Sequence, residues 1–125
     1  MTKRQFYKQL QELYECYSLL LKWLKVGDVF TCVDERICLV NVEDKRTFQG
    51  FDLAGCLYMD RPDVFISADM KALIDQCDCR IGNLWDVLEV GNERTKVTKE
   101  IITKIKLVVN DLDGLIERMK QDNGY

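Results

Sequence analysis

Residues 6–24 read FYKQLQELYECYSLLLKWL, and apolar side chains recur along this stretch at intervals of four and three residues. That spacing places six apolar side chains in one stripe along a helix. Because charged side chains lie off the stripe, the pattern predicts a helix over residues 3–26, ended by Gly27 as a left-handed cap. The stripe consists of Phe6, Leu10, Leu13, Tyr17, Leu20 and Leu24.

The other end of the chain repeats this pattern. An amphipathic helix is expected over residues 98–122, with Thr98 as its N-cap and Gly114 as a point where another backbone approaches closely. Its stripe consists of Ile101, Ile105, Val108, Leu112, Leu115 and Met119. The two stripes have equal length and equal period, which favours packing of the two helices on each other, within one chain or across a dimer. The alternative is that each helix covers a sheet.

Between these helices the sequence favours strands. Residues 29–33 and 37–42 are β-branched and apolar around a polar turn, which is a hairpin pattern. A third strand is expected at 47–53 and a fourth at 56–59 or 64–66, followed by a short helix at 68–77. The pattern at 83–90 does not decide between a helix and a strand.

The predicted fold class is therefore α+β, in a single domain that spans residues 1–125. A small antiparallel sheet of about three to four strands lies in a β-rich acidic middle at 28–66. Together with the short helix, it is framed by the two long amphipathic terminal helices.

The composition is typical of a folded protein in a reducing compartment. With 125 residues, of which 47% are hydrophobic, the chain is long enough to bury its own core. It contains neither a signal peptide nor a run of about 20 apolar residues, so we expect no membrane contact and a cytoplasmic location. The six cysteines lie among apolar neighbours and are expected to be free thiols.

Motifs that carry catalysis are missing from the sequence. It contains no histidine, which removes the commonest general base, and no glycine-rich phosphate loop. Cys77 and Cys79 are separated by one residue and lack a second ligand pair, so we interpret them as packing residues rather than a zinc site or a redox pair. The sequence therefore predicts a protein without enzymatic activity, cofactor or bound metal.

Charge is distributed unevenly along the chain. Residues 27–93 carry fourteen acidic and six basic side chains, a net charge of −8, although the whole chain has a net charge of −3. The simplest interpretation is a solvated face, and a carboxylate metal site is the least favoured one. The functional interpretation is a surface that binds a basic protein. Its candidate residues are Asp60, Asp63, Asp69, Asp75, Asp78, Asp86 and Glu89.

In size, charge and lack of catalytic motifs, the chain resembles the small accessory proteins of phages and mobile elements, anti-CRISPR inhibitors among them. No motif carries this resemblance, so it implies a class of function and no residue roles. We therefore expect a protein-binding regulator or inhibitor that presents its acidic surface to a basic partner, such as a protein whose groove takes nucleic acid.

Three other functions are weighed against this one. The first is an assembly protein that forms a homodimer or a larger oligomer through its two stripes. The second, which is less favoured, is an enzyme that uses carboxylates or a cysteine as nucleophile. The third is direct nucleic-acid binding, which the acidic composition disfavours. The residues considered for phosphate contact are the lysines Lys96, Lys99, Lys104 and Lys106.

Overall fold

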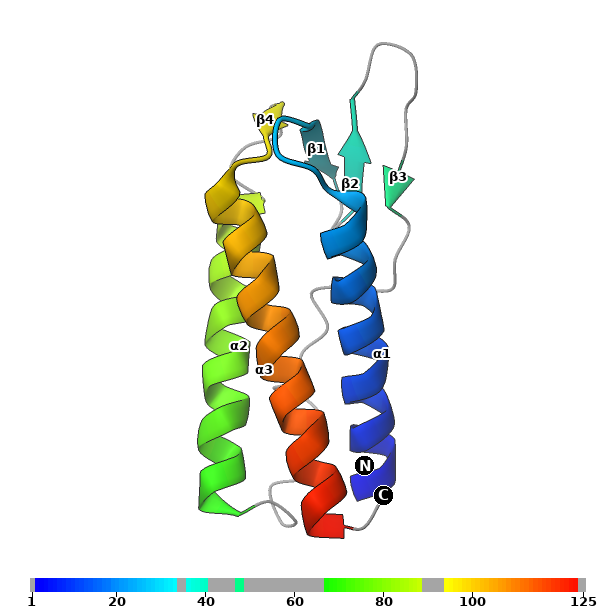
Figure 1. The fold of residues 1–125 in the computed structure, drawn as a ribbon, viewed down its shortest axis with the longest axis vertical. Coiled ribbons are helices and arrows are strands. Elements are labelled where there is room, and N and C mark those ends of the chain that lie inside the picture. Colours follow the sequence, from blue (N-terminus) through cyan, green and yellow to red (C-terminus); the bar gives the residue numbers. More distant parts are fainter. Residues whose placement is uncertain (1, 34–35, 41–46, 49–66, 89–93, 124–125) are drawn as a thin grey trace.

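The computed structural model describes residues 2–33, 36–40, 47–48, 67–88 and 94–123. These residues form three helices and a four-stranded antiparallel sheet, which confirms the α+β class expected from the sequence. Figure 1 shows the three helices side by side, with the sheet at one end of the helical layer and both chain termini at the other.

Helix α1 (Lys3–Trp23) begins at a capping box, in which two backbone N–H groups that the helix leaves unpaired find side-chain acceptors. The Gln5 N–H donates to the Thr2 hydroxyl over 3.1 Å, and the Thr2 N–H donates to the Gln5 side-chain oxygen over 2.8 Å. The capping box therefore fixes the start of the helix at the position expected from the sequence.

The end of α1 differs from the prediction. The helix stops at residue 23 rather than 26, because Leu24 has extended backbone angles. Gly27 therefore does not cap the helix. It lies in a turn that is closed by the Asp28 N–H, which donates to the Lys25 carbonyl over 3.0 Å. The φ of 96° at Gly27 explains the glycine, since side chains with a Cβ rarely adopt it.

Helix α2 (Ala68–Leu88) has 21 residues and continues far beyond the helix predicted at 68–77. That prediction was wrong because the apolar stripe does not stop at residue 77. The same alternation of four and three residues continues to the end of the helix, and it includes the part of segment 83–90 that the structure describes. The buried stripe consists of Met70, Ile74, Cys77, Ile81, Leu84 and Leu88.

Helix α3 (Lys99–Asn123) confirms the predicted terminal helix to within one residue at each end. Its cap also agrees, since the Ile101 N–H donates to the Thr98 hydroxyl over 3.3 Å. The expectation for Gly114 was wrong. A Cβ placed there would meet no heavy atom of the described residues within 4 Å, so no close packing requires the glycine.

Helix α3 lies between α1 and α2 and runs antiparallel to both (Figure 1). The terminal helices therefore pack on each other within one chain, and all twelve residues of the two predicted stripes are buried in the core. The Trp85 indole N–H donates to the Tyr17 hydroxyl over 3.0 Å inside this core, which joins α2 to α1. Three helices, rather than two, thus share the apolar core.

The sheet has the strand order β3-β2-β1-β4, and each neighbouring pair is antiparallel. The first three strands begin at or within one residue of their predicted positions, although β2 ends at residue 39 rather than 42. Residues 49–53, and both candidates for the fourth predicted strand at 56–59 and 64–66, lie outside the described residues. The strands are β1 (Val29–Val33), β2 (Arg36–Leu39), β3 (Thr47–Phe48) and β4 (Thr95–Lys96).

One face of the sheet closes the end of the core. The cross-strand pairs Phe30–Leu39 and Cys32–Ile37 are buried, while Thr31, between the two buried residues of β1, is only half-buried. Because successive side chains of a strand point to opposite faces, this alternation shows which side of the sheet contacts the helices.

Strand β4 was not predicted, since two residues carry no periodic pattern. It pairs with the free edge of β1, where Lys96 lies opposite Val29. Next to this pair, the Gly27 N–H donates to the Val97 carbonyl over 2.9 Å, and the Val97 N–H donates to the Asp28 carbonyl over 2.7 Å. These bonds fix the turn after α1 against the segment that leads into α3.

Candidate interaction surfaces

The exposed side of α2 carries the described part of the predicted acidic surface. Asp69, Asp75 and Asp86 are exposed there, and we call these three residues the acidic face. Asp75 and Asp86 are separated by eleven residues, or about three helical turns, so they lie on one line about 16 Å apart. Lys71 is exposed on this helix, and its other cation, Arg80, is half-buried.

Asp69 lies at one end of α2 and away from that line. Its carboxylate is 3.9 Å from the Arg118 guanidinium of α3, and it also lies in the first helical turn, where the helix dipole favours a negative charge. Both interactions favour the helix, and the Asp69 side chain is still 85% exposed. Asp75 and Asp86 thus form one line along the helix, and Asp69 extends the acidic face to the end of α2.

Asp78 does not belong to the acidic surface, contrary to the prediction. Only 8% of the residue is exposed, so it does not face a partner. It falls at the edge of the buried stripe, four residues after Ile74, and counting charges along the sequence does not separate such a position from an exposed one. Asp60, Asp63 and Glu89 lie outside the described residues.

A small polar cluster joins α2 to α3. The Arg80 guanidinium lies 2.6 Å from the Asp111 carboxylate, and the two side chains are 33% and 16% exposed. Burial, together with the negative charges of Asp111 and Asp78, raises the pKa of the Cys77 thiol to about 12, while Arg80 acts in the opposite direction. The thiol therefore stays protonated at neutral pH and is a poor nucleophile.

The two cysteines of α2 point in different directions. Cys77 is buried and Cys79 is exposed, as expected for positions two residues apart on a helix. The packing interpretation therefore applies to Cys77 and was wrong for Cys79. Within the described ranges, no three His, Cys, Asp or Glu side chains are grouped so that they could hold a metal ion.

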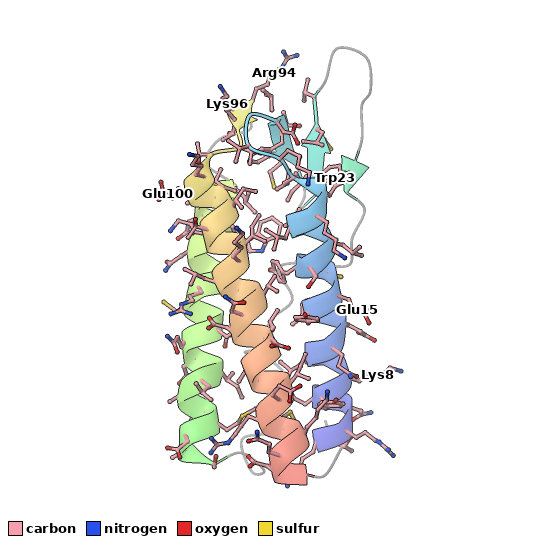
Figure 2. The ribbon with its side chains drawn as sticks, in the orientation of Figure 1. Lys8, Glu15, Trp23, Arg94, Lys96 and Glu100 are labelled. Atoms are coloured by element: carbon pink, nitrogen blue, oxygen red, sulfur yellow. The ribbon has the colours of Figure 1, made fainter. Side chains whose placement is uncertain are left out.

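A cluster of cations, which the sequence analysis missed, lies at the sheet end of the molecule. Lys25 follows α1, Arg94 precedes β4, Lys96 is in β4 and Lys99 begins α3, and all four are exposed. We call these four residues the basic end. Figure 2 shows Arg94 and Lys96 extending away from the helices into solvent.

The hydrogen bonds between Gly27, Asp28 and Val97 bring these cations together. Lys25 is far from Arg94 in the sequence, but its turn is bonded to the segment just after β4. The sequence contained a partial signal, since Lys96 and Lys99 were noted for phosphate contact. It could not indicate that Lys25 joins them, because β4 and its pairing with β1 were not predictable.

Two apolar side chains are exposed on α1 and in the turn that follows it. Leu19 of α1 and Val26 of the turn are 56% and 55% exposed, while Figure 2 shows Lys8 and Glu15 extending outward from the helix. A cavity of about 520 Å³ lies on this helix, and its lining includes Tyr14, Ser18 and Leu21. The described residues that line it all belong to α1 and form one wall, so they define no ligand.

The described residues form an α+β protein in which three helices are closed at one end by a small sheet. None of the described helices combines the length and the hydropathy needed to cross a membrane. No protein-family model, no curated protein and no solved structure matches the chain.

Proposed function

We propose that this protein is a non-enzymatic, protein-binding regulator or inhibitor that presents its acidic face to a basic partner. A partner whose groove takes nucleic acid fits best, which is the mode of action expected of a small phage-type anti-CRISPR or anti-defence protein. The observation that carries the proposal is the exposure of Asp69, Asp75 and Asp86 along one helix whose opposite side is buried in the core.

A rigid helix suits this role. The buried stripe of α2 and the Tyr17–Trp85 hydrogen bond hold the helix in place, so its carboxylates need little ordering on binding. Exposed charges of this kind act mainly on the association rate and on the choice of partner, and salt screens them beyond about 10 Å at 0.1 M. Binding is therefore expected to be fast at low salt and weaker at high salt.

The assembly alternative has less support. Its surface would consist of the two stripes of the terminal helices, yet all twelve of those residues are buried within a single chain. A homodimer would have to use another surface, such as the one formed by Leu19 of α1 and Val26 of the following turn. We therefore prefer the regulator.

Charge reversal on α2 tests the proposal. The tagged protein is used to capture partners from host lysate at low salt, and the captured protein is identified and then purified. The variant Asp69→Lys/Asp75→Lys/Asp86→Lys should lose binding to that purified partner, and duplex DNA should displace the wild-type protein from it.

A matched control separates the acidic face from the overall charge. The variant Glu12→Lys/Glu15→Lys/Asp113→Lys makes the same change of net charge at exposed positions of α1 and α3. It should keep most of the binding. Equal losses in the two variants, or binding that is insensitive to salt and to the α2 variant, would contradict the proposal.

A further inference from the structure

We propose that the basic end of this protein binds the phosphate backbone of nucleic acid without reading its sequence. The inference concerns the surface at the sheet end of the molecule and does not depend on the acidic face of α2. It differs from what the acidic composition of the whole chain suggests, because four exposed cations lie at this end beside only two described acidic residues, Asp28 and Glu100.

The first argument is that the fold brings the cations together from separate parts of the chain. Two segments that are distant in the sequence supply the cations, and they are bonded through the Gly27 N–H to the Val97 carbonyl and through the Val97 N–H to the Asp28 carbonyl. Lys96 is also held in register by pairing with β1. The backbone positions of the cations are thus set by hydrogen bonds rather than left to a free terminus.

The second argument is that acidic side chains do not pair with these four cations. No ion pair joins Lys25, Arg94, Lys96 or Lys99 to another described residue, although other cations of the chain form such pairs. The described acids closest in sequence are otherwise engaged. Asp28 accepts the Lys25 backbone N–H over 2.9 Å, and the Glu100 carboxylate lies 4.0 Å from Lys104. Figure 2 shows Glu100 extending sideways from α3, away from Arg94 and Lys96.

The third argument is the geometry of the individual elements. Arg94 directly precedes β4 and Lys96 ends it, and both are exposed while Thr95 between them is half-buried. One strand of a nucleic acid carries a phosphate about every 3.4 Å along its axis, so cations this close in the chain can contact phosphates of the same strand. Lys99 stands at the N-terminus of α3, where the helix dipole adds positive potential.

The chemistry of this surface favours nucleic acid over other polyanions. The four exposed cations belong to the turn after α1, to β4 and the residue before it, and to the start of α3, and such a spread suits a line of phosphates better than one specific carboxylate. A lipid surface would call for several inserted apolar side chains, and next to Lys25 only one described apolar residue, Val26, is exposed.

Salt-dependent binding of purified protein to labelled oligonucleotides tests this proposal. Fluorescence anisotropy with a 20-nucleotide single strand and a 20-base-pair duplex should give dissociation constants of about 1–100 μM near physiological salt. If the four cations each contact one phosphate, the logarithm of the binding constant falls against the logarithm of the salt concentration with a slope near −2.8 for the single strand and near −3.6 for the duplex. No binding at 50 mM salt and 100 μM protein would overturn the proposal.

Two variants with the same net charge separate the basic end from general electrostatics. Lys25→Gln/Arg94→Gln/Lys96→Gln should weaken binding at least tenfold at low salt and make the slope shallower by about 2 for the single strand. The control variant Lys8→Gln/Lys71→Gln/Lys106→Gln removes three exposed cations elsewhere, and its slope should stay close to that of the wild-type protein. Equal effects in both variants would overturn the proposal.

Two other probes cover the competing classes of partner. Binding to polyglutamate but to neither oligonucleotide would overturn the proposal in favour of an acidic protein. Binding only to vesicles that contain phosphatidylserine would overturn it in favour of a lipid surface. None of these measurements uses the partner or the α2 variants of the proposed regulatory function, so either proposal can fail alone.

Discussion

Replacing two glycines on the exposed sides of α2 and α3 by alanine is expected to stabilise this protein. Gly82 and Gly114 lie inside helices, are exposed, and would meet no heavy atom of the described residues within 4 Å if they carried a Cβ. Glycine in a helix interior costs about 0.8–1.0 kcal/mol relative to alanine, because more backbone entropy is lost on folding. Gly82→Ala and Gly114→Ala should each raise the free energy of unfolding by that amount.

The two effects should add, since the glycines lie on different helices and point into open space. The double variant is then expected to gain about 1.6–2 kcal/mol. At about 2.1 cal/mol/K per residue, unfolding of 125 residues has an entropy of about 0.26 kcal/mol/K, so the Tm should rise by about 6–8 °C. Urea and thermal unfolding followed by circular dichroism at 222 nm measure both quantities.

Gly27→Ala is the matched control, because it is the same substitution in equally open space. It differs in its φ of 96°, which an L-residue adopts at a cost of about 1–2 kcal/mol. Gly27→Ala should therefore lower the free energy of unfolding, whereas the helical substitutions raise it. Loss of stability in Gly114→Ala, or no effect in Gly27→Ala, would refute this reasoning.

Three further predictions concern buried and half-buried polar groups. Tyr17→Phe removes the acceptor of the buried Trp85 indole N–H and should lower the free energy of unfolding in urea by about 1–3 kcal/mol; an unchanged value would contradict it. Asp111→Asn removes the ion pair with Arg80, and because Arg80 is one-third exposed the loss should be only about 1 kcal/mol. The pKa of Cys77 is raised from 9.0 to about 12, so the folded protein keeps a proton that the unfolded chain loses. Its stability should therefore fall from pH 9 toward pH 12 more steeply than that of Cys77→Ala, and parallel profiles would exclude this linkage.

The helices show which parts of the fold a sequence pattern can predict. The terminal helices were predictable because their apolar spacing is unbroken for six positions. Helix α2 has an equally regular stripe from Met70 to Leu88. Its second half was missed because the predicted helix was ended at Cys77, although the spacing of four and three residues continues through Ile81 and Leu84. On the helix, Gly82 lies on the exposed side while the stripe continues past it.

The surfaces were harder to predict than the helices, for a related reason. Asp78 was assigned to the acidic surface by counting charges, and only the full length of α2 places it beside the core. The basic end depends on a pairing of two residues between β1 and β4, which has too few positions to produce a pattern. Residues that meet through such a short contact become neighbours only in the folded chain.

The two charged surfaces have different orientations, and this limits what one partner can contact. The acidic face extends along α2, parallel to the long axis of the helical layer, while the basic end closes that axis at the sheet (Figure 1). A purely basic protein that bound α2 and continued past its end would meet Arg94 and Lys96, where like charges repel. Such a partner should stop short of the sheet, so neutralising the basic end with Lys25→Gln/Arg94→Gln/Lys96→Gln should leave its affinity for the acidic face unchanged in a binding titration at low salt. Tighter binding by this variant would show instead that the partner reaches the sheet end of the molecule.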